Sequence, residues 1–212
     1  MSVLDGDNIW FSAVNSYTSF MVIGHITKGS NTFTEIFRGD KPNHIGIFSG
    51  QLYTSNAGDN MPGLISRIGD GLPTTDNQIA TVEIPGGFKA NGFVFKNSTV
   101  AYACYTETDS IIRYDYNTSD SSWRQSYSLP RQNYLSYPVP YSILVKEVGM
   151  NIWVYVNYRT RVHLIIDDGT RLDVASDFAF AGAGLQFKGL TFSPEGKPIL
   201  LLLLLLLLLR NR

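Results

Sequence analysis

Two stretches of the chain share the pattern that decides its fold. They read NIWFSAVNSYTSFMVIGHI, residues 8–26, and NIWVYVNYRTRVHLII, residues 151–166. Each follows a short turn-like stretch, and each alternates apolar and polar residues in the manner of a half-buried β-strand. The two stretches begin 143 residues apart, which fits three units of about 47 to 48 residues. The sequence therefore predicts a strand-rich repeat.

Further units of the same kind begin at Ile45, at Gly92, near residue 143 and at Gly189, at intervals of 47, 51 and 46 residues. Within one unit, residues 111–116 and 123–129 alternate on either side of turn residues, as in a β-hairpin. Strand-rich repeats of this length form propeller blades, whereas solenoids of this period are helical. We therefore expect an all-β protein with a β-propeller fold. A β-sandwich with accidental internal similarity is the alternative.

The repeat defines the expected domain organisation. Residues 1–199 are predicted to form a partial propeller domain of about four blades and a fragment of a fifth, so part of a ring is expected to be missing. Residues 200–212 are a low-complexity tail that contains ten consecutive leucines, Leu200 to Leu209. This run is shorter than the roughly 20 residues of a membrane-spanning helix. We expect no membrane partner and interpret the tail as a truncated or aberrant terminus.

Composition excludes further classes of protein. Charged residues make up 17% of the chain, the net charge is −1, and no basic block is present, so nucleic acid is not expected as a partner. The single cysteine, Cys104, lies in an apolar run and is expected to be buried and unreactive. The residues after Met1 form neither a basic nor an apolar leader segment, so no signal peptide is expected. The cellular location is not predicted.

The unit that begins near Gly92 carries a more specific pattern. Residues 91–95 read NGFVF and residues 101–116 read AYACYTETDSIIRYDY, while GLTFSPEGK at 189–197 repeats the blade opening. Over about residues 40–200 the chain resembles the senescence-marker-protein/gluconolactonase family, that is, regucalcin and its relatives. NHL-repeat and strictosidine-synthase-like proteins share part of this signature. The resemblance implies a six-bladed propeller that hydrolyses a small lactone or ester.

The resemblance also implies a metal site. In that family a divalent cation such as Ca²⁺ or Zn²⁺ lies at the channel mouth, held by a Glu, an Asn and an Asp from different blades. Asn91 matches the Asn ligand, but Tyr141 stands where the family has Asp, and a neutral phenol is a poor ligand for Ca²⁺. The Glu belongs to a first blade that we expect to be missing. Hydrolysis is therefore expected to be impaired, and no catalytic residue is assigned.

Asn43 is the nearest match to an Asn that contacts substrate in the family, and His44 follows it where the family usually has Asp. Both asparagines have an alternative interpretation. Asn43 follows Pro42 and would serve as a turn residue, and Asn91 would order the tight turn before Gly92.

Two other classes of function remain open. The first is a non-catalytic, NHL-like propeller that binds a protein or glycan, with Tyr134, Tyr137 and Tyr141 on its binding surface. Local packing of these tyrosines against Pro138 and Pro140 is the alternative interpretation of the same residues. The second is a partial chain with no stable function alone, since unpaired strand edges tend to aggregate.

Overall fold

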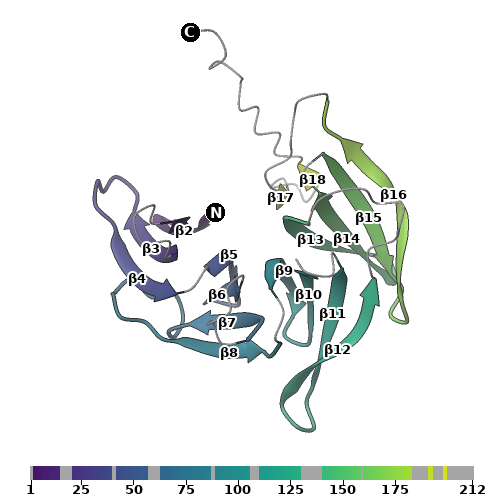
Figure 1. Ribbon diagram of the computed structural model, residues 1–212, viewed down its shortest axis with the longest axis horizontal. Helices are drawn as coiled ribbons and strands as arrows, with labels where there is room; N and C mark the ends of the chain where they lie inside the picture. Colours follow the sequence, from purple (N-terminus) through teal and green to yellow (C-terminus); the bar gives the residue numbers. More distant parts are fainter. Residues whose placement is uncertain are drawn as a thin grey trace.

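The computed structural model describes residues 2–14, 21–39, 42–56, 63–86, 89–105, 110–129, 140–158 and 160–182, with the backbone of 191–192 and 198–199. Sixteen strands form four antiparallel sheets of four strands each (Figure 1). Blade 1 consists of β1 (Ser2–Asp5), β2 (Asn8–Val14), β3 (Met21–Thr27) and β4 (Thr34–Gly39). Blade 2 consists of β5 (Pro42–Phe48), β6 (Gln51–Asn56), β7 (Ile65–Ile68) and β8 (Ala80–Ile84). Blade 3 consists of β9 (Ala90–Asn97), β10 (Val100–Tyr105), β11 (Ile111–Asn117) and β12 (Ser122–Leu129). Blade 4 consists of β13 (Ser142–Val148), β14 (Asn151–Tyr158), β15 (Arg161–Asp167) and β16 (Leu172–Phe180).

The blades are arranged in an arc around a common centre (Figure 1). Strands in every blade follow the chain order, with β1, β5, β9 and β13 near the centre and β4, β8, β12 and β16 on the outside. The inner strands β5 and β13 both contact β9. The predicted all-β propeller is therefore confirmed, and its repeat explains why Asn8 and Asn151 each begin the second strand of a blade.

A short hairpin follows blade 4. It pairs β17 (Thr191–Phe192) with β18 (Pro198–Ile199), in the region where the sequence predicts a fifth-blade fragment. The poly-Leu tail lies outside the described residues, and the number of blades in a complete ring remains a prediction. Within the described part of the chain, no helix is long and apolar enough to cross a membrane.

Most of the hydrophobic core lies between the blades. Separate clusters of buried residues fill the spaces between blades 1 and 2, 2 and 3, and 3 and 4. Between blades 2 and 3, the Phe95 ring stacks on Phe48 with centroids 5.0 Å apart and meets Tyr53 at 4.8 Å. Cys104 is buried in the cluster between blades 3 and 4, as predicted. Each blade thus depends on its neighbour to cover its apolar face.

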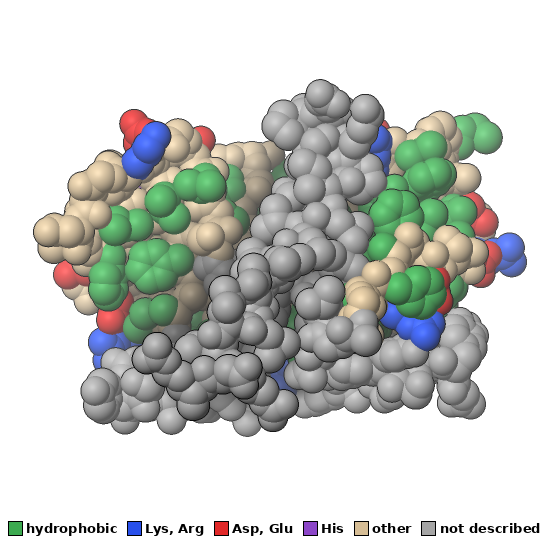
Figure 2. Space-filling view, turned by 90° about the horizontal axis from the view of Figure 1, so that it is seen from above, with side chains coloured by type: hydrophobic (Ala, Val, Ile, Leu, Met, Phe, Trp, Pro, Cys, Tyr) green, Lys and Arg blue, Asp and Glu red, His purple; other side chains and the backbone are tan. Residues whose placement is uncertain are grey.

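The repeated tryptophans show this dependence directly. Trp10 on β2 is 1% exposed, and its Nε1 donates a hydrogen bond of 2.7 Å to the carbonyl oxygen of Pro73 in blade 2. Trp153 occupies the matching position on β14 but is only half-buried, in a cluster on the far face of blade 4. Phe178 and Phe180 on β16 are 40% and 59% exposed. Figure 2 shows hydrophobic side chains gathered on two flanks of the molecule.

A buried ion pair joins blades 3 and 4. Nη1 of Arg113 on β11 donates to both carboxylate oxygens of Asp167, at 2.9 and 2.8 Å. Tyr102 on β10 and the backbone N–H of Gly169 also donate to this carboxylate. Asp167 is completely buried, and four donations of this kind satisfy its oxygens. The ion pair therefore fixes the position of one blade against the next.

Removal of the Asp167 carboxylate tests this role. We expect Asp167→Ala to lower the free energy of unfolding by about 1.5–3 kcal/mol, because Arg113 would keep only Asp115 as its partner and the buried Tyr102 hydroxyl would lose its acceptor. Urea denaturation measures this difference. Asp173 is the matched control, since it pairs with Arg171 at 2.6 Å on an exposed surface. Asp173→Ala should cost less than about 1 kcal/mol. Equal losses in the two variants would contradict the assignment.

Candidate functional site: the central end of the inner strands

The inner strands of blades 2 and 3 each begin with a β-bulge. In blade 2, Pro42 pairs with Asn56 and Ile45 pairs with Thr54, so Asn43 and His44 together face one residue of β6. In blade 3, Ala90 pairs with Tyr105 and Gly92 with Cys104, which leaves Asn91 as the extra residue. A bulge interrupts the alternation of a strand and turns the side chain of the extra residue in a new direction.

These bulges bring the two predicted site residues together. Nδ2 of Asn43 donates a hydrogen bond of 2.7 Å to Oδ1 of Asn91, and Nδ2 of Asn91 donates to the carbonyl oxygen of Pro140 at 3.1 Å. Oγ of Ser12 donates to the carbonyl oxygen of Asn43 over a longer 3.4 Å. The resulting chain of hydrogen bonds crosses from blade 1 to Pro140, two residues before blade 4 begins. Asn43 lies within strand β5, so its interpretation as a turn residue is wrong.

Gly92 allows the inner strands of blades 3 and 4 to approach each other. A Cβ atom at this position would lie 3.3 Å from the carbonyl oxygen of Tyr141 and 3.4 Å from the Cα of Ser142. Contacts this short would push β9 and β13 apart. Glycine therefore serves close packing here, directly beside Asn91.

The amide of Asn91 is already engaged at both ends. Its oxygen accepts a hydrogen bond from Asn43, its nitrogen donates to Pro140, and position 141 supplies a phenol instead of a carboxylate. No group of three or more Asp, Glu, His or Cys side chains suited to a metal ion occurs among the residues the structure describes. The described residues therefore do not fit the divalent cation that the family resemblance implies.

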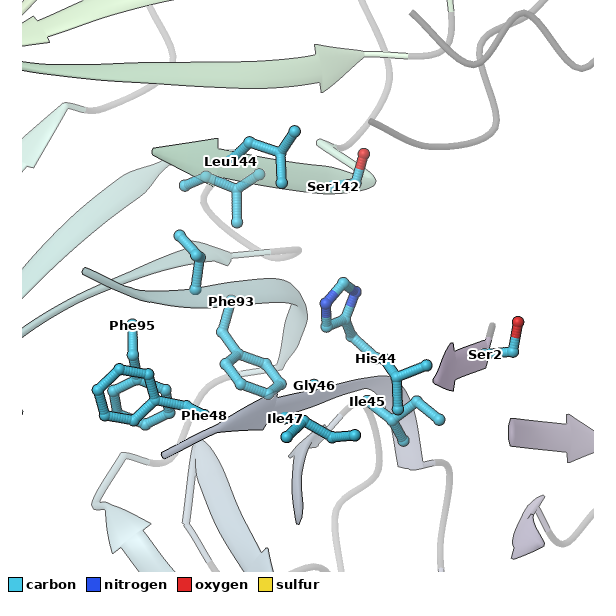
Figure 3. Close-up of a pocket in the computed structure, with 13 residues that line it drawn as sticks. Ser2, His44, Ile45, Gly46, Ile47, Phe48, Phe93, Phe95, Ser142 and Leu144 are labelled. Atoms are coloured by element: carbon cyan, nitrogen blue, oxygen red, sulfur yellow. The ribbon is translucent and has the colours of Figure 1, made fainter. Parts of the chain in front are cut away.

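A cavity of about 360 Å³ lies between the inner strands (Figure 3). This volume lies within the usual range of small-molecule pockets, roughly 300–1,000 Å³. The walls come from β1, β5, β9 and β13, and most of the lining side chains are apolar. Thirteen of the described residues line it: Ser2, Val3, His44, Ile45, Gly46, Ile47, Phe48, Phe93, Val94, Phe95, Ser142, Ile143 and Leu144.

His44 enters this cavity from the bulge of β5 (Figure 3). Its backbone N–H donates to Oγ of Ser55, its carbonyl oxygen accepts from Oγ1 of Thr54, and its ring lies edge-on to Phe93 with centroids 5.1 Å apart. Nδ1 is buried and has no hydrogen-bond partner. Burial lowers the pKa of His44 to about 4. The imidazole is therefore neutral at pH 7.

Ser142 lies across the cavity from His44, at the start of β13 (Figure 3). It is 3% exposed, and its Oγ is buried without a hydrogen-bond partner. In the sequence, His44 stands out only as a departure from the family pattern, and Ser142 does not stand out. A serine directly after the expected ligand position is a weak signal, because only the close approach of β9 and β13 places it at the cavity.

The tyrosines of the alternative binding surface are only partly described. Tyr134 and Tyr137 lie outside the described residues, so the protein- or glycan-binding hypothesis remains a prediction. Tyr141 is described, and its backbone N–H donates to the carbonyl oxygen of Asn157 at 2.8 Å.

Comparison with solved structures supports the fold. A crystal structure of a protein from Lactobacillus plantarum is similar, with a TM-score of 0.57 and 17% identity, over 92% of this chain and 58% of that one. A putative 6-phosphogluconolactonase from Bacteroides uniformis is similar, with a TM-score of 0.54 and 13% identity, over 91% of this chain and 60% of that one. The chain thus spans about three fifths of the length of these two proteins. No protein-family model and no curated protein sequence matches it. The chain shares the fold of these two proteins, and membership of the senescence-marker family remains a prediction.

The amide pair offers a direct test of the bulge arrangement. We expect Asn91→Ala to lower the free energy of unfolding by about 1–3 kcal/mol, because the Asn43 amide and the Pro140 carbonyl would lose their partners. A double-mutant cycle with Asn43→Ala isolates the shared bond, and its coupling energy should be about 0.5–1.5 kcal/mol. Strictly additive effects would show that the two side chains do not interact.

The low pKa of His44 makes stability depend on pH. An unfolded His titrates near its ordinary value of about 6.5. Between this value and about 4, the unfolded state binds a proton that folded His44 does not, so the free energy of unfolding falls as pH falls through this window. Chemical denaturation at pH values from 7 to 4 measures the slope. His44→Phe should flatten it, whereas an unchanged slope would place His44 in contact with water.

Proposed function

We propose that this chain is a lactonase-type propeller that binds a small lactone or ester in the cavity between its inner strands. The observation that carries the proposal is the cavity itself, with its apolar walls and two buried polar atoms that lack partners in the protein. Ligand sites commonly combine a mostly apolar lining with a few polar groups that fix orientation. The propeller fold shared with a putative 6-phosphogluconolactonase supports the same class of ligand.

Metal-dependent hydrolysis is impaired in this proposal. Both ends of the Asn91 amide form hydrogen bonds between blades, and Tyr141 stands where the family has a carboxylate. A hard cation needs several oxygen ligands, which these residues do not provide. Without such an ion, Asn91 and Tyr141 would not polarise a lactone carbonyl or activate a water molecule in the manner of the family.

Calorimetry and a hydrolysis assay test the two halves of this proposal. We expect glucono-δ-lactone, 6-phosphoglucono-δ-lactone or the alkyl lactone δ-octalactone to bind, with no turnover above the uncatalysed rate. We expect no micromolar binding of Ca²⁺ or Zn²⁺. Micromolar metal binding accompanied by metal-dependent turnover would contradict the proposed impairment.

A variant with a filled cavity tests where the lactone binds. Leu144→Trp adds bulk to the cavity wall and should abolish lactone binding. Leu4→Trp makes the same change on a side chain that is 68% exposed and does not line the cavity, so it should leave binding intact. Retained binding in Leu144→Trp, or failure of all three lactones to bind the native protein, would overturn the proposed function.

A further inference from the structure

Among the described residues that line the cavity we assign to a lactone or ester, none has a charged side chain. The polar side chains there are Ser2, His44 and Ser142, and the remaining ten lining residues are aliphatic, aromatic or glycine. Anionic ligands are usually held by Arg or Lys side chains, or by a row of backbone N–H groups at a helix end. The described walls of this cavity are β-strands and offer neither arrangement.

His44 does not supply the missing positive charge. Its imidazole would have to be protonated to attract a phosphate or carboxylate, but burial lowers its pKa to about 4. At pH 7 an anion placed here would lose its hydration and meet no charged side chain among the described residues of the lining. Desolvation of an ion without a partner costs several kcal/mol, which is enough to exclude such a ligand.

A sugar-like body fits the cavity poorly for a related reason. Every hydroxyl group that leaves water needs a new hydrogen-bond partner, and an unpaired one costs about 1–3 kcal/mol. Three polar side chains cannot satisfy a polyhydroxylated ring. The apolar wall built by Ile45, Phe93 and Leu144 instead suits an alkyl chain or a plain hydrocarbon ring.

The two atoms without partners indicate where the polar end of the ligand lies. Oγ of Ser142 and Nδ1 of His44 are both buried, and the two residues line the same cavity from strands β13 and β5. In Figure 3 the His44 ring extends toward β13, whereas the Ser142 hydroxyl points away from His44 and would turn to a ligand by rotation about its Cα–Cβ bond. A hydroxyl group at Ser142 can donate to a carbonyl oxygen, and a neutral imidazole nitrogen can pair with a donor or an acceptor according to its tautomer. A ligand that carries one ester group would satisfy such atoms.

We propose that this cavity selects an uncharged lactone or ester with an alkyl body, whose carbonyl group meets Ser142 and His44, and that it rejects phosphorylated, carboxylated and polyhydroxylated lactones. The inference rests on the proposed function and narrows its ligand class. It separates this chain from the phosphorylated substrate named for its putative 6-phosphogluconolactonase neighbour.

The test compares ligands that differ in charge or polarity. Calorimetric titration of the full chain at pH 7 would use δ-octalactone, its ring-opened form 5-hydroxyoctanoate, glucono-δ-lactone and 6-phosphoglucono-δ-lactone. We expect δ-octalactone to bind at least about tenfold more tightly than each of the others, which corresponds to roughly 1.4 kcal/mol or more. Equal or tighter binding of 5-hydroxyoctanoate, or of either sugar lactone, would overturn the inference while the proposed function stands.

Variants then test the polar end. Ser142→Ala should weaken δ-octalactone binding by about three- to tenfold, which is typical of one lost hydrogen bond. Ser66→Ala is the matched control, because Ser66 is 1% exposed on β7 and does not line the cavity. Unchanged affinity in Ser142→Ala would refute the assigned contact. If no ligand in the series binds the native protein, the inference and the proposed function are both wrong.

Discussion

A four-stranded blade has two faces, and in this protein the neighbouring blades must cover them. The aromatic contacts of Phe95 with Phe48 and Tyr53, and the ion pair of Arg113 with Asp167, act across the boundaries between blades. Burial of apolar area between repeats is the main source of stability in such architectures. The same packing draws the inner strands together, so the central cavity is a product of how the blades meet.

The cavity owes its chemistry to two local departures from regular strand geometry. Bulges at the start of β5 and β9 turn Asn43 and Asn91 toward each other, and His44 enters the cavity from the first of them. The hydrogen bonds of both amides thereby hold neighbouring blades in place. Among the described residues that line the cavity, a neutral imidazole and two serine side chains lie among apolar ones, a combination suited to an uncharged ligand.

Much of the fold could be predicted from the sequence because blade formation depends on short-range signals. Alternating strands, turn residues such as those at 117–120 and the spacing of the two Asn-Ile-Trp segments all act over a few tens of residues. The site could be predicted only in part. Asn43 and Asn91 were identified by resemblance, but their mutual hydrogen bond depends on β-bulges that the sequence pattern does not predict. Ser142 reaches the cavity only because Gly92 lets two strands approach, which is a property of the packed structure.

The proposed ligand site at the centre of the propeller places the His44 ring against the bound molecule. The chain has three histidines, and His25 and His163 are buried in blades 1 and 4, outside the cavity lining. Two-bond ¹H–¹⁵N spectra of the labelled imidazoles during titration with δ-octalactone would test this claim most directly. We predict that the His44 ring signals shift while those of His25 and His163 stay in place. Binding that leaves the His44 signals unchanged would contradict it.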